Sequence, residues 1–381
     1  MDGGPGRTPA DSPMREANRR NAFFDSLVDR RDLVWMGQNT THLEPPPEVL
    51  AAITESIERR EFQIYAPPLG LEQLRELIAL DLGLPGREVI VTDGAVSGLY
   101  HICKQLGADI SELVTTDPGW PWPEQFLAAV GKPARVIDVY DGAVGYKLTA
   151  AKLAERIKPG SLIYLIDPLN PLGSSYSGDE LQRICAIAQE SRCIVVHDCT
   201  YRHFARNPTL AAHYYPEGTL TTYSFSKWLG LAGFRIGAIV APPGLAARLA
   251  AAPPNSLGSS IVAQRAAIAG LRVRQAWVER LRTVNWTNQE IIVGAIREAG
   301  LGQPVVYPSD GNFLAIDISS TGRTGDALAA EFLRHDVFIR SGTYQSKISG
   351  QRFVKISTAV PTEWAKRCAD VVRKVSSVEV K

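Results

Sequence analysis

Between residues 88 and 241, short runs of β-branched and other apolar residues alternate with segments of helical periodicity. This alternation is typical of a parallel sheet with helices on its faces. The clearest helix is expected at Asp179–Glu190, which has one apolar face and is preceded by a Ser177–Glu180 capping box. The predicted fold class is α/β, with a mostly parallel sheet of seven strands at Glu88–Thr92, Leu113–Thr116, Ala134–Val139, Ser161–Ile166, Ile194–Asp198, Leu220–Phe225 and Ile236–Ala241.

The pattern changes after Pro253. Long helical runs extend to about Gly300, and shorter strand-like segments follow. We expect strands around Gly311–Ile318, Val337–Arg340 and Arg352–Ser357, and a last helix near Thr362–Val375. This order of elements predicts a second, smaller α+β domain.

Composition narrows the function classes. The chain has 381 residues, of which 45% are hydrophobic, and a net charge of +1, so it can bury a large core and has no excess charge for nucleic acid or a membrane surface. We expect a small-molecule partner, and no segment is long and apolar enough to cross a membrane. Five cysteines without a C-x-x-C pair favour reduced, buried thiols and a cytoplasmic location. Residues 1–20 are rich in Gly, Pro, Arg and Asp, which predicts a disordered tail.

The segment around Lys227 carries the strongest chemical signal. It reads Ser224-Phe225-Ser226-Lys227-Trp228-Leu229-Gly230, with Arg235 eight residues after the lysine. A lysine amine can form a Schiff base with a cofactor, and hydroxyls and a guanidinium can bind a phosphate. The flanking residues differ from those of a solvated helix face, so a covalent cofactor site is favoured over a surface lysine.

Other polar residues follow predicted strands, where the carboxyl ends of an α/β sheet form ligand sites. Asp198 ends an apolar strand, and its carboxylate can hold a ring nitrogen in the protonated state. Gly94, Ala95 and Val96 follow the first strand and open a helix, whose free N–H groups suit an anion. The six histidines show no metal-ligand spacing, so no metal site is expected.

Together these motifs resemble the class I/II aminotransferases, which are fold-type I enzymes that use pyridoxal 5′-phosphate (PLP). Tyr201, three residues after Asp198, matches the family's D-x-x-Y pattern, and Asn170 lies in a turn that resembles N-P-x-G. The resemblance implies that Tyr201 and Asn170 share the 3-oxygen of PLP and that Trp120 stacks on its ring. It makes Lys227, Asp198 and Tyr201 the catalytic residues, and it implies phosphate ligands at Gly94, Ala95, Val96, Ser224, Ser226 and Arg235.

The resemblance also has consequences for assembly. It implies that residues 51–280 form a large PLP-binding domain and that residues 21–50 and 281–381 form the small domain. Tyr65 resembles the residue that reaches the phosphate of the partner subunit, so a homodimer with active sites at the subunit interface is expected.

The expected substrate pocket departs from the family pattern. Lys355, in Phe353-Val354-Lys355-Ile356-Ser357, stands where an arginine commonly binds the substrate carboxylate, and Asn39 stands where a glycine is common. A lysine cannot make the two-pronged contact of an arginine, so we expect an altered pocket unless Arg340 or Arg352 takes that role. The pocket candidates are Gln38, Asn39, Thr40, His42, Asn312, Arg340, Tyr344 and Lys355.

Transamination of an amino acid, through an external aldimine and a Cα carbanion, is the expected activity. The alternative is β- or γ-elimination, cyclisation or carbon–carbon bond formation on a larger amino acid such as S-adenosylmethionine, because PLP supports each of these on one fold. A PLP-sensing regulator would need a DNA-binding domain, for which the roughly twenty residues ahead of the core are too few. A nicotinamide dehydrogenase is disfavoured because no G-x-G-x-x-G follows the first strand.

Overall fold

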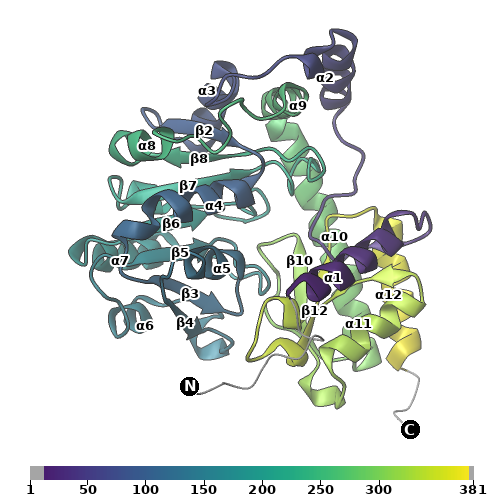
Figure 1. Ribbon diagram of the computed structural model, residues 1–381. Helices are drawn as coiled ribbons and strands as arrows, with labels where there is room; N and C mark the ends of the chain where they lie inside the picture. The colour runs from purple at the N-terminus through teal and green to yellow at the C-terminus, as the bar shows by residue number, and fades with distance from the viewer. Residues whose placement is uncertain (1–12, 377–381) are drawn as a thin grey trace, which may run out of the picture.

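The computed structural model describes residues 13–376. Its centre is a seven-stranded sheet in the order β2-β8-β7-β6-β5-β3-β4, in which only β8 runs antiparallel to its neighbours (Figure 1). The strands span Glu88–Thr92 (β2), Leu113–Asp117 (β3), Ala134–Asp138 (β4), Leu162–Ile166 (β5), Ile194–Asp198 (β6), Thr219–Ser224 (β7) and Gly237–Ala241 (β8). The predicted mostly parallel sheet is confirmed, with small shifts at the strand ends.

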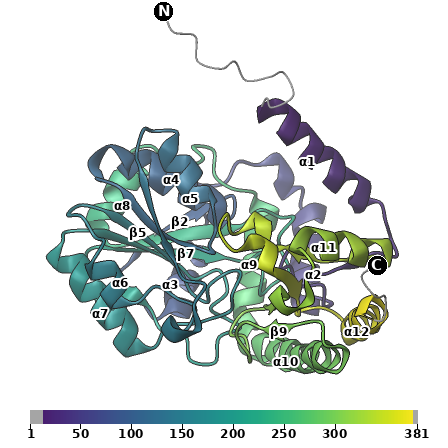
Figure 2. The same cartoon turned by 90° about the horizontal axis from the view of Figure 1, so that it is seen from below.

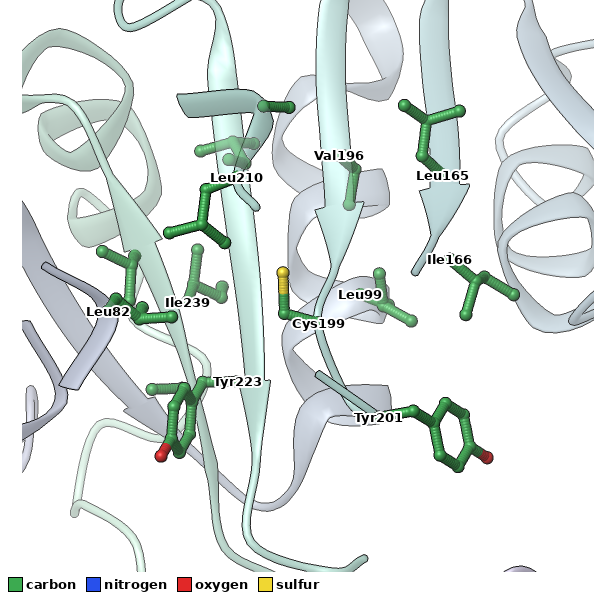
Figure 3. Packing of buried hydrophobic residues seen from close by; sticks show 14 of the residues in the cluster. Leu82, Leu99, Leu165, Ile166, Val196, Cys199, Tyr201, Leu210, Tyr223 and Ile239 are labelled. Atoms are coloured by element: carbon green, nitrogen blue, oxygen red, sulfur yellow. The ribbon is translucent and has the colours of Figure 1, made fainter. Parts of the chain in front are cut away.

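Helices cover both faces of this sheet (Figures 1 and 2). The helices of this large unit are α2 (Pro47–Glu58), α3 (Glu72–Leu82), α4 (Ala95–Leu106), α5 (Trp122–Ala128), α6 (Ala150–Ala154), α7 (Gly178–Glu190), α8 (Pro243–Ala250) and α9 (Ile261–Arg272). Helix α2 packs against α9 and lies away from the strands. The capping box of α7 is confirmed, because Ser177 Oγ accepts from Glu180 N at 3.3 Å and the Glu180 carboxylate accepts from Ser177 N at 2.8 Å. Figure 3 shows Leu99 of α4 beside Ile166 and Val196 of the sheet, within one large hydrophobic core.

A smaller unit packs beside the large sheet. A four-stranded sheet in the order β12-β13-β10-β9 is joined by a parallel pair, β1-β11, that brings an N-terminal strand next to a C-terminal one. Its own apolar cluster includes Ile316, Phe332 and Val372. The elements are β1 (Val34–Trp35), β9 (Gln303–Pro304), β10 (Phe313–Asp317), α11 (Gly325–Arg334), β11 (Val337–Phe338), β12 (Arg340–Ser341), β13 (Phe353–Ser357) and α12 (Thr362–Ser376).

Helix α10 (Arg274–Ala299) belongs to both units. Trp277 and Leu281, near its start, lie in the large core, and Ile292 and Ile296, near its end, lie in the small core. Two separate clusters agree with a two-domain chain, and we propose that the boundary near residue 280 lies inside this helix.

The N-terminal segment differs from the expectation. Residues 13–20 belong to helix α1 (Pro13–Val28), so a disordered tail over 1–20 is wrong for that part, while residues 1–12 lie outside the described range. Leu27 is buried against Leu33 and Phe338, and Phe24 packs beside them. The first half of α1 is polar, and its composition therefore predicts disorder. The apolar residues that anchor the helix lie near its end.

Two further expectations concern the cysteines and the membrane. All five cysteines are buried and free of disulfide bonds, as predicted. Within residues 13–376 we find no helix with the length and apolar character needed to span a membrane.

Candidate active site

A cavity of about 430 Å³ opens at the carboxyl ends of β3, β5, β6 and β7, with β12 and β13 of the smaller sheet on its other side. Parallel strands place the residues that follow them at one edge of the sheet, which is why this set converges. The predicted residues that line it together are Lys227, Asp198, Tyr201, Asn170, Trp120, Ala95, Val96, Ser224, Ser226, Arg235, Lys355, Asn39, Arg340, Gln38, Thr40 and Tyr344.

Lys227 follows β7 and lies partly buried in this cavity. Its Nζ donates to the carbonyl of Gln38 at 3.0 Å. Burial, with the positive charges of Arg235 and Arg340, lowers the pKa of Lys227 from 10.5 to about 8. A larger fraction of this amine is therefore neutral and nucleophilic near neutral pH than of an exposed lysine.

Asp198, at the end of β6, is buried and accepts four hydrogen bonds. Its Oδ1 accepts from Thr200 N at 3.1 Å, Thr200 Oγ1 at 2.6 Å and Thr222 Oγ1 at 2.9 Å. Its Oδ2 accepts from the phenol of Tyr164 at 2.7 Å. Burial and the nearby Asp198 raise the pKa of Tyr164 well above its ordinary value, so this phenol stays a donor. The donors fix the carboxylate in place and stabilise its negative charge.

The segment after β2 forms an anion cradle with Arg235. Gly94 has a φ of +86° and precedes α4, so the first N–H groups of that helix face the cavity beside Ala95 and Val96. A Cβ at Gly94 would meet the Arg235 guanidinium, and the positive φ is a conformation that other residues rarely adopt, so both features favour glycine here. Arg235 donates to the carbonyls of Ala232 at 2.8 Å and Asp93 at 3.3 Å. Its charge thus stays available for an anion.

Four side chains meet on the opposite side of the cavity. The Nδ2 of Asn39 donates to Asn170 Oδ1 at 3.2 Å and to the Tyr201 phenol oxygen at 3.1 Å. The Nζ of Lys355 lies 3.3 Å from the same Asn170 oxygen. Burial raises the pKa of Tyr201, so its phenol is protonated at neutral pH. Asn39 therefore links the predicted cofactor residues to the predicted substrate pocket.

The backbone of Asn39 has a conformation that favours glycine, the residue expected at this position. Its φ is +56°, a left-handed conformation that glycine adopts freely and asparagine tolerates better than most residues. Asn39 is held there by its N–H, which donates to Ser357 Oγ at 2.8 Å, and by its carbonyl, which accepts from Asn312 at 2.8 Å. The side chain of Asn39, which a glycine would lack, occupies part of the cavity.

Lys355 and Arg340 are cross-strand neighbours on β13 and β12. Lys355 is 2% exposed, and burial together with Arg340 and Lys227 lowers its pKa well below the ordinary value. Arg340 stacks over the Tyr344 ring, 4.0 Å from its centre. Neither forms an ion pair with a carboxylate of residues 13–376, so this side of the cavity favours an anionic ligand.

Five candidates do not line the cavity, and the first of them, Gly94, lies beside the Arg235 guanidinium at the start of α4. His42 packs against Trp364 with ring centres 5.1 Å apart, and burial, with Lys227 nearby, lowers its pKa to about 4. Asn312 supports the Asn39 backbone from outside the cavity. Arg352 lies 3.5 Å from Asp317 and stacks over Tyr140, so it is remote from the pocket. Tyr65 is 76% exposed on the surface of the single chain.

Several residues of the site were not predicted. Thr222 and Tyr164 hold Asp198 from the two strands that flank β6, and the pairing of Asp198 with Thr222 follows from the register of the folded sheet. Arg20 and Gln345 also line the cavity. Arg20 was assigned to the tail, and Gln345 carries no motif, so only the folded chain reveals them.

The geometry agrees with comparisons to known proteins. Residues 31–372 match the family described as aminotransferase class I and II. The chain belongs to that family. Relatives of this aminotransferase include the aspartate aminotransferase of Pyrococcus horikoshii, 24% identical over 90% of both chains, and the histidinol-phosphate aminotransferase of Akkermansia muciniphila, 28% identical over 91% of both.

Solved structures of other aminotransferases have the same fold as this chain. An aminotransferase from Mycobacterium tuberculosis superposes with a TM-score of 0.83 at 22% identity, covering 98% of this chain and 99% of that one. Aspartate aminotransferase from Thermus thermophilus with maleate gives 0.81 at 22% identity, over 98% and 100% of the two chains. The chain is thus an enzyme of the fold-type I class, and members of its family depend on PLP.

The residues present fit that cofactor. Lys227 offers an amine, Asp198 a fixed carboxylate, and Arg235 with the start of α4 an anion cradle that a side chain at position 94 would fill. Trp120, half-buried after β3, offers an aromatic face in the same cavity. Because these groups come from separate strands and still meet in one space, the fit does not depend on any single motif.

Proposed function

We propose that this enzyme binds PLP covalently through Lys227 and transfers the amino group of an amino acid to a keto acid. The single observation that carries the proposal is the position of Lys227 in one cavity with Asp198 and Arg235. The names of the relatives, aspartate and histidinol-phosphate aminotransferases, support transamination over elimination or carbon–carbon bond formation.

The chain's own residues would hold the cofactor at both ends. Arg235, Ser224, Ser226 and the first N–H groups of α4 would bind its phosphate, since an arginine fork and a helix start both favour oxyanions. Asp198 would keep the ring nitrogen protonated. Tyr201 and Asn170 would hold the ring oxygen, and Trp120 would cover one face.

When bound, PLP supplies an electron-withdrawing ring that stabilises the charge left on the α-carbon once its proton departs. Lys227 would carry that proton. With the substrate bound, the neutral amine of Lys227 would accept the proton from the substrate α-carbon and would hold it for return. A pKa of about 8 suits an acid–base group at neutral pH.

The substrate carboxylate would bind Lys355. This lysine lies buried beside Asn170 and has no acidic partner among the described residues, so a carboxylate would relieve a buried charge or restore the proton to a neutral amine. The Asn39 side chain, which occupies space that a glycine would leave open, would narrow the same pocket. The altered pocket is the one feature that favours the alternative reactions.

We also propose a homodimer with active sites at the subunit interface. Tyr65 lies next to Phe62 and Ile64, and all three are more than half exposed in the single chain. Such a patch is unfavourable in water and favours contact with another subunit. Light scattering should give twice the mass of one chain, and Tyr65→Ala should weaken PLP retention, whereas a monomer that retains PLP would contradict the dimer.

The decisive experiment mixes the PLP-loaded protein with single amino acids and follows the cofactor spectrum and the products. Transamination predicts a keto acid and the amine form of the cofactor in equal amounts, and a keto acid should then restore the starting spectrum. Release of a leaving group or of a cyclised product without the amine form would instead support the alternative. Lys355→Arg offers a comparison, because it restores the family's usual residue.

A further inference from the structure

Asn39 is in contact with both of the residues that would hold the ring oxygen of the cofactor. Its Nδ2 lies 3.2 Å from Asn170 Oδ1 and 3.1 Å from the Tyr201 phenol oxygen. The residue is buried, with 1% of its surface exposed, so water does not compete for these two bonds. A glycine, the residue expected at this position, would make neither of them.

The neighbouring groups fix the direction of each hydrogen bond. Lys355 Nζ donates to Asn170 Oδ1 over 3.3 Å, and a lysine amine is a donor in either protonation state. The atom of Asn39 that meets the same oxygen is therefore its donor, Nδ2, because two amide oxygens would repel each other. Ser357 agrees with this orientation, since its hydroxyl donates to Asn39 Oδ1 at 3.4 Å.

These directions decide where the remaining hydrogens point. The Asn170 oxygen accepts from Lys355 and Asn39, so the NH₂ on the other branch of that amide is turned away from both. The Tyr201 oxygen accepts from Asn39, so the phenol keeps its own hydrogen for another acceptor. Within residues 13–376 neither the Asn170 NH₂ nor the Tyr201 hydroxyl donates to an acceptor, and both residues line the cavity. Two donors are thus available where the cofactor would bind.

We propose that Asn39 is a positioning residue, which turns the hydrogens of Tyr201 and Asn170 together toward the ring oxygen of PLP. This role rests on the proposed function, in which those two residues hold that oxygen. The bond from Asn39 to Tyr201 also polarises the phenol, because hydrogen bonds in a buried chain strengthen one another. Asn39 acts through its two neighbours and not by contact with the reacting atoms.

The consequence is a lower pKa for the nitrogen that joins Lys227 to PLP. Donors that face the ring oxygen stabilise its negative charge, and an oxygen stabilised in this way attracts the proton on the neighbouring nitrogen less strongly. That proton therefore leaves at a lower pH when both donors are well aligned. The protonated and deprotonated forms differ in visible absorbance, so a pH titration of the PLP-loaded protein measures this pKa without any substrate.

The test is this spectral titration in the parent protein and in Asn39→Gly. Glycine tolerates the φ of +56°, so the variant removes both side-chain bonds while the backbone conformation stays accessible. We expect the midpoint to rise by roughly 0.5–1 pH unit, the worth of about one hydrogen bond. Asn288→Ala is the matched control. It removes another buried asparagine whose Nδ2 makes two bonds, to the carbonyls of Thr358 and Val360 at 2.9 and 2.8 Å, but which lies outside the cavity, so its midpoint should stay unchanged.

A double variant separates positioning from a general structural effect. Tyr201→Phe alone should raise the midpoint. In that background Asn39→Gly should raise it by less than in the parent, because one of the two groups through which Asn39 acts is gone. An unmoved midpoint in Asn39→Gly, or an equal rise in both backgrounds, would overturn the role of Asn39 and leave the proposed function intact. A protein that develops no visible absorbance with PLP would contradict the proposed function, and this role with it.

Discussion

The two sides of the active-site cavity differ in how their polar groups are satisfied. On the side formed by the large sheet, the Asp198 carboxylate accepts four hydrogen bonds. On the side formed by the smaller sheet, Lys355 and Arg340 have no acidic partner within residues 13–376, and the side-chain amide of Gln345 has no hydrogen-bond partner among the same residues. The carboxylate on the first side is fully hydrogen-bonded in the free chain, whereas the cations and the amide on the second side are left for a ligand.

The difference indicates which side of the cavity determines the cofactor chemistry and which side determines the substrate. Groups that are already bonded are preorganised and act on any substrate in the same way. Groups left without partners lower stability until the right ligand binds, so they discriminate among ligands. We infer that the large sheet sets the cofactor chemistry and that the smaller sheet with α1 sets the substrate, and the predictions below test this division.

The largest effect is expected at the lysine on the side formed by the large sheet. Lys227→Ala should abolish the visible absorbance of the lysine-bound cofactor and all turnover, because no other amine replaces it. Lys355→Ala is the matched control, since it removes the second buried lysine of the same cavity and should keep the absorbance. Absorbance that survives in Lys227→Ala, or disappears only in Lys355→Ala, would reverse our assignment of the two sides.

Asp198→Asn should come next. It keeps the shape but places an amide donor among the donors of Tyr164, Thr200 and Thr222, and it removes the charge that we propose would face the ring nitrogen of PLP. We expect turnover to fall on the order of 10²–10³-fold. Asp317→Asn is a control, because Asp317 also accepts from a tyrosine, Tyr140 at 2.7 Å, but lies outside the cavity. Equal losses in the two variants would point to a general defect in folding.

Lys355→Met should weaken amino-acid binding while the cofactor stays in place. The loss should be roughly 1.5–3 kcal/mol, the range of a hydrogen bond to a charged group, or about ten- to a hundredfold in Kd. Spectral titration of the PLP-loaded protein measures it, and Lys355→Arg should retain most of the affinity. If Lys355→Met binds as tightly as the parent, Arg340 becomes the candidate for the α-carboxylate.

The smallest effect is expected on the pKa of Lys227, which the charge of Arg340 across the cavity helps to lower. Only the neutral amine of Lys227 attacks PLP, so attachment of PLP to the cofactor-free protein should accelerate as pH rises, with a midpoint near 8. Arg340 helps to lower that pKa, so Arg340→Gln should move the midpoint upward. Arg352→Gln should leave the midpoint unchanged. If Arg340→Gln also leaves it unchanged, the charge of Arg340 does not influence the pKa of Lys227.

Much of the large sheet was predictable because most of its strands are short runs rich in apolar and β-branched residues. β2 and β6 were predicted with the bounds that they have. The site residues at the strand ends followed from the rule that carboxyl ends converge. The capping box of α7 is likewise a local signal, complete within four residues.

The rest required contacts between distant residues. The end of helix α1 packs against Phe338, which is more than three hundred residues away, and no local sequence pattern predicts that contact. The positive φ of Asn39 is held by hydrogen bonds with Ser357 and Asn312, which lie far away in the sequence. The side-chain amide of Gln345 has no hydrogen-bond partner among the described residues, which only the folded chain can show. Tertiary context, which a local reading lacks, decided each of these cases.

Helix α10 ties the two hydrophobic cores into a single cooperative unit. Its first turns are anchored by Trp277, whose indole donates to the Trp228 carbonyl at 2.6 Å, directly after Lys227. Its last turns are packed with Ile292 and Ile296 in the other core. Loss of either core would remove the packing around one end of α10, so unfolding of one unit is expected to destabilise the other.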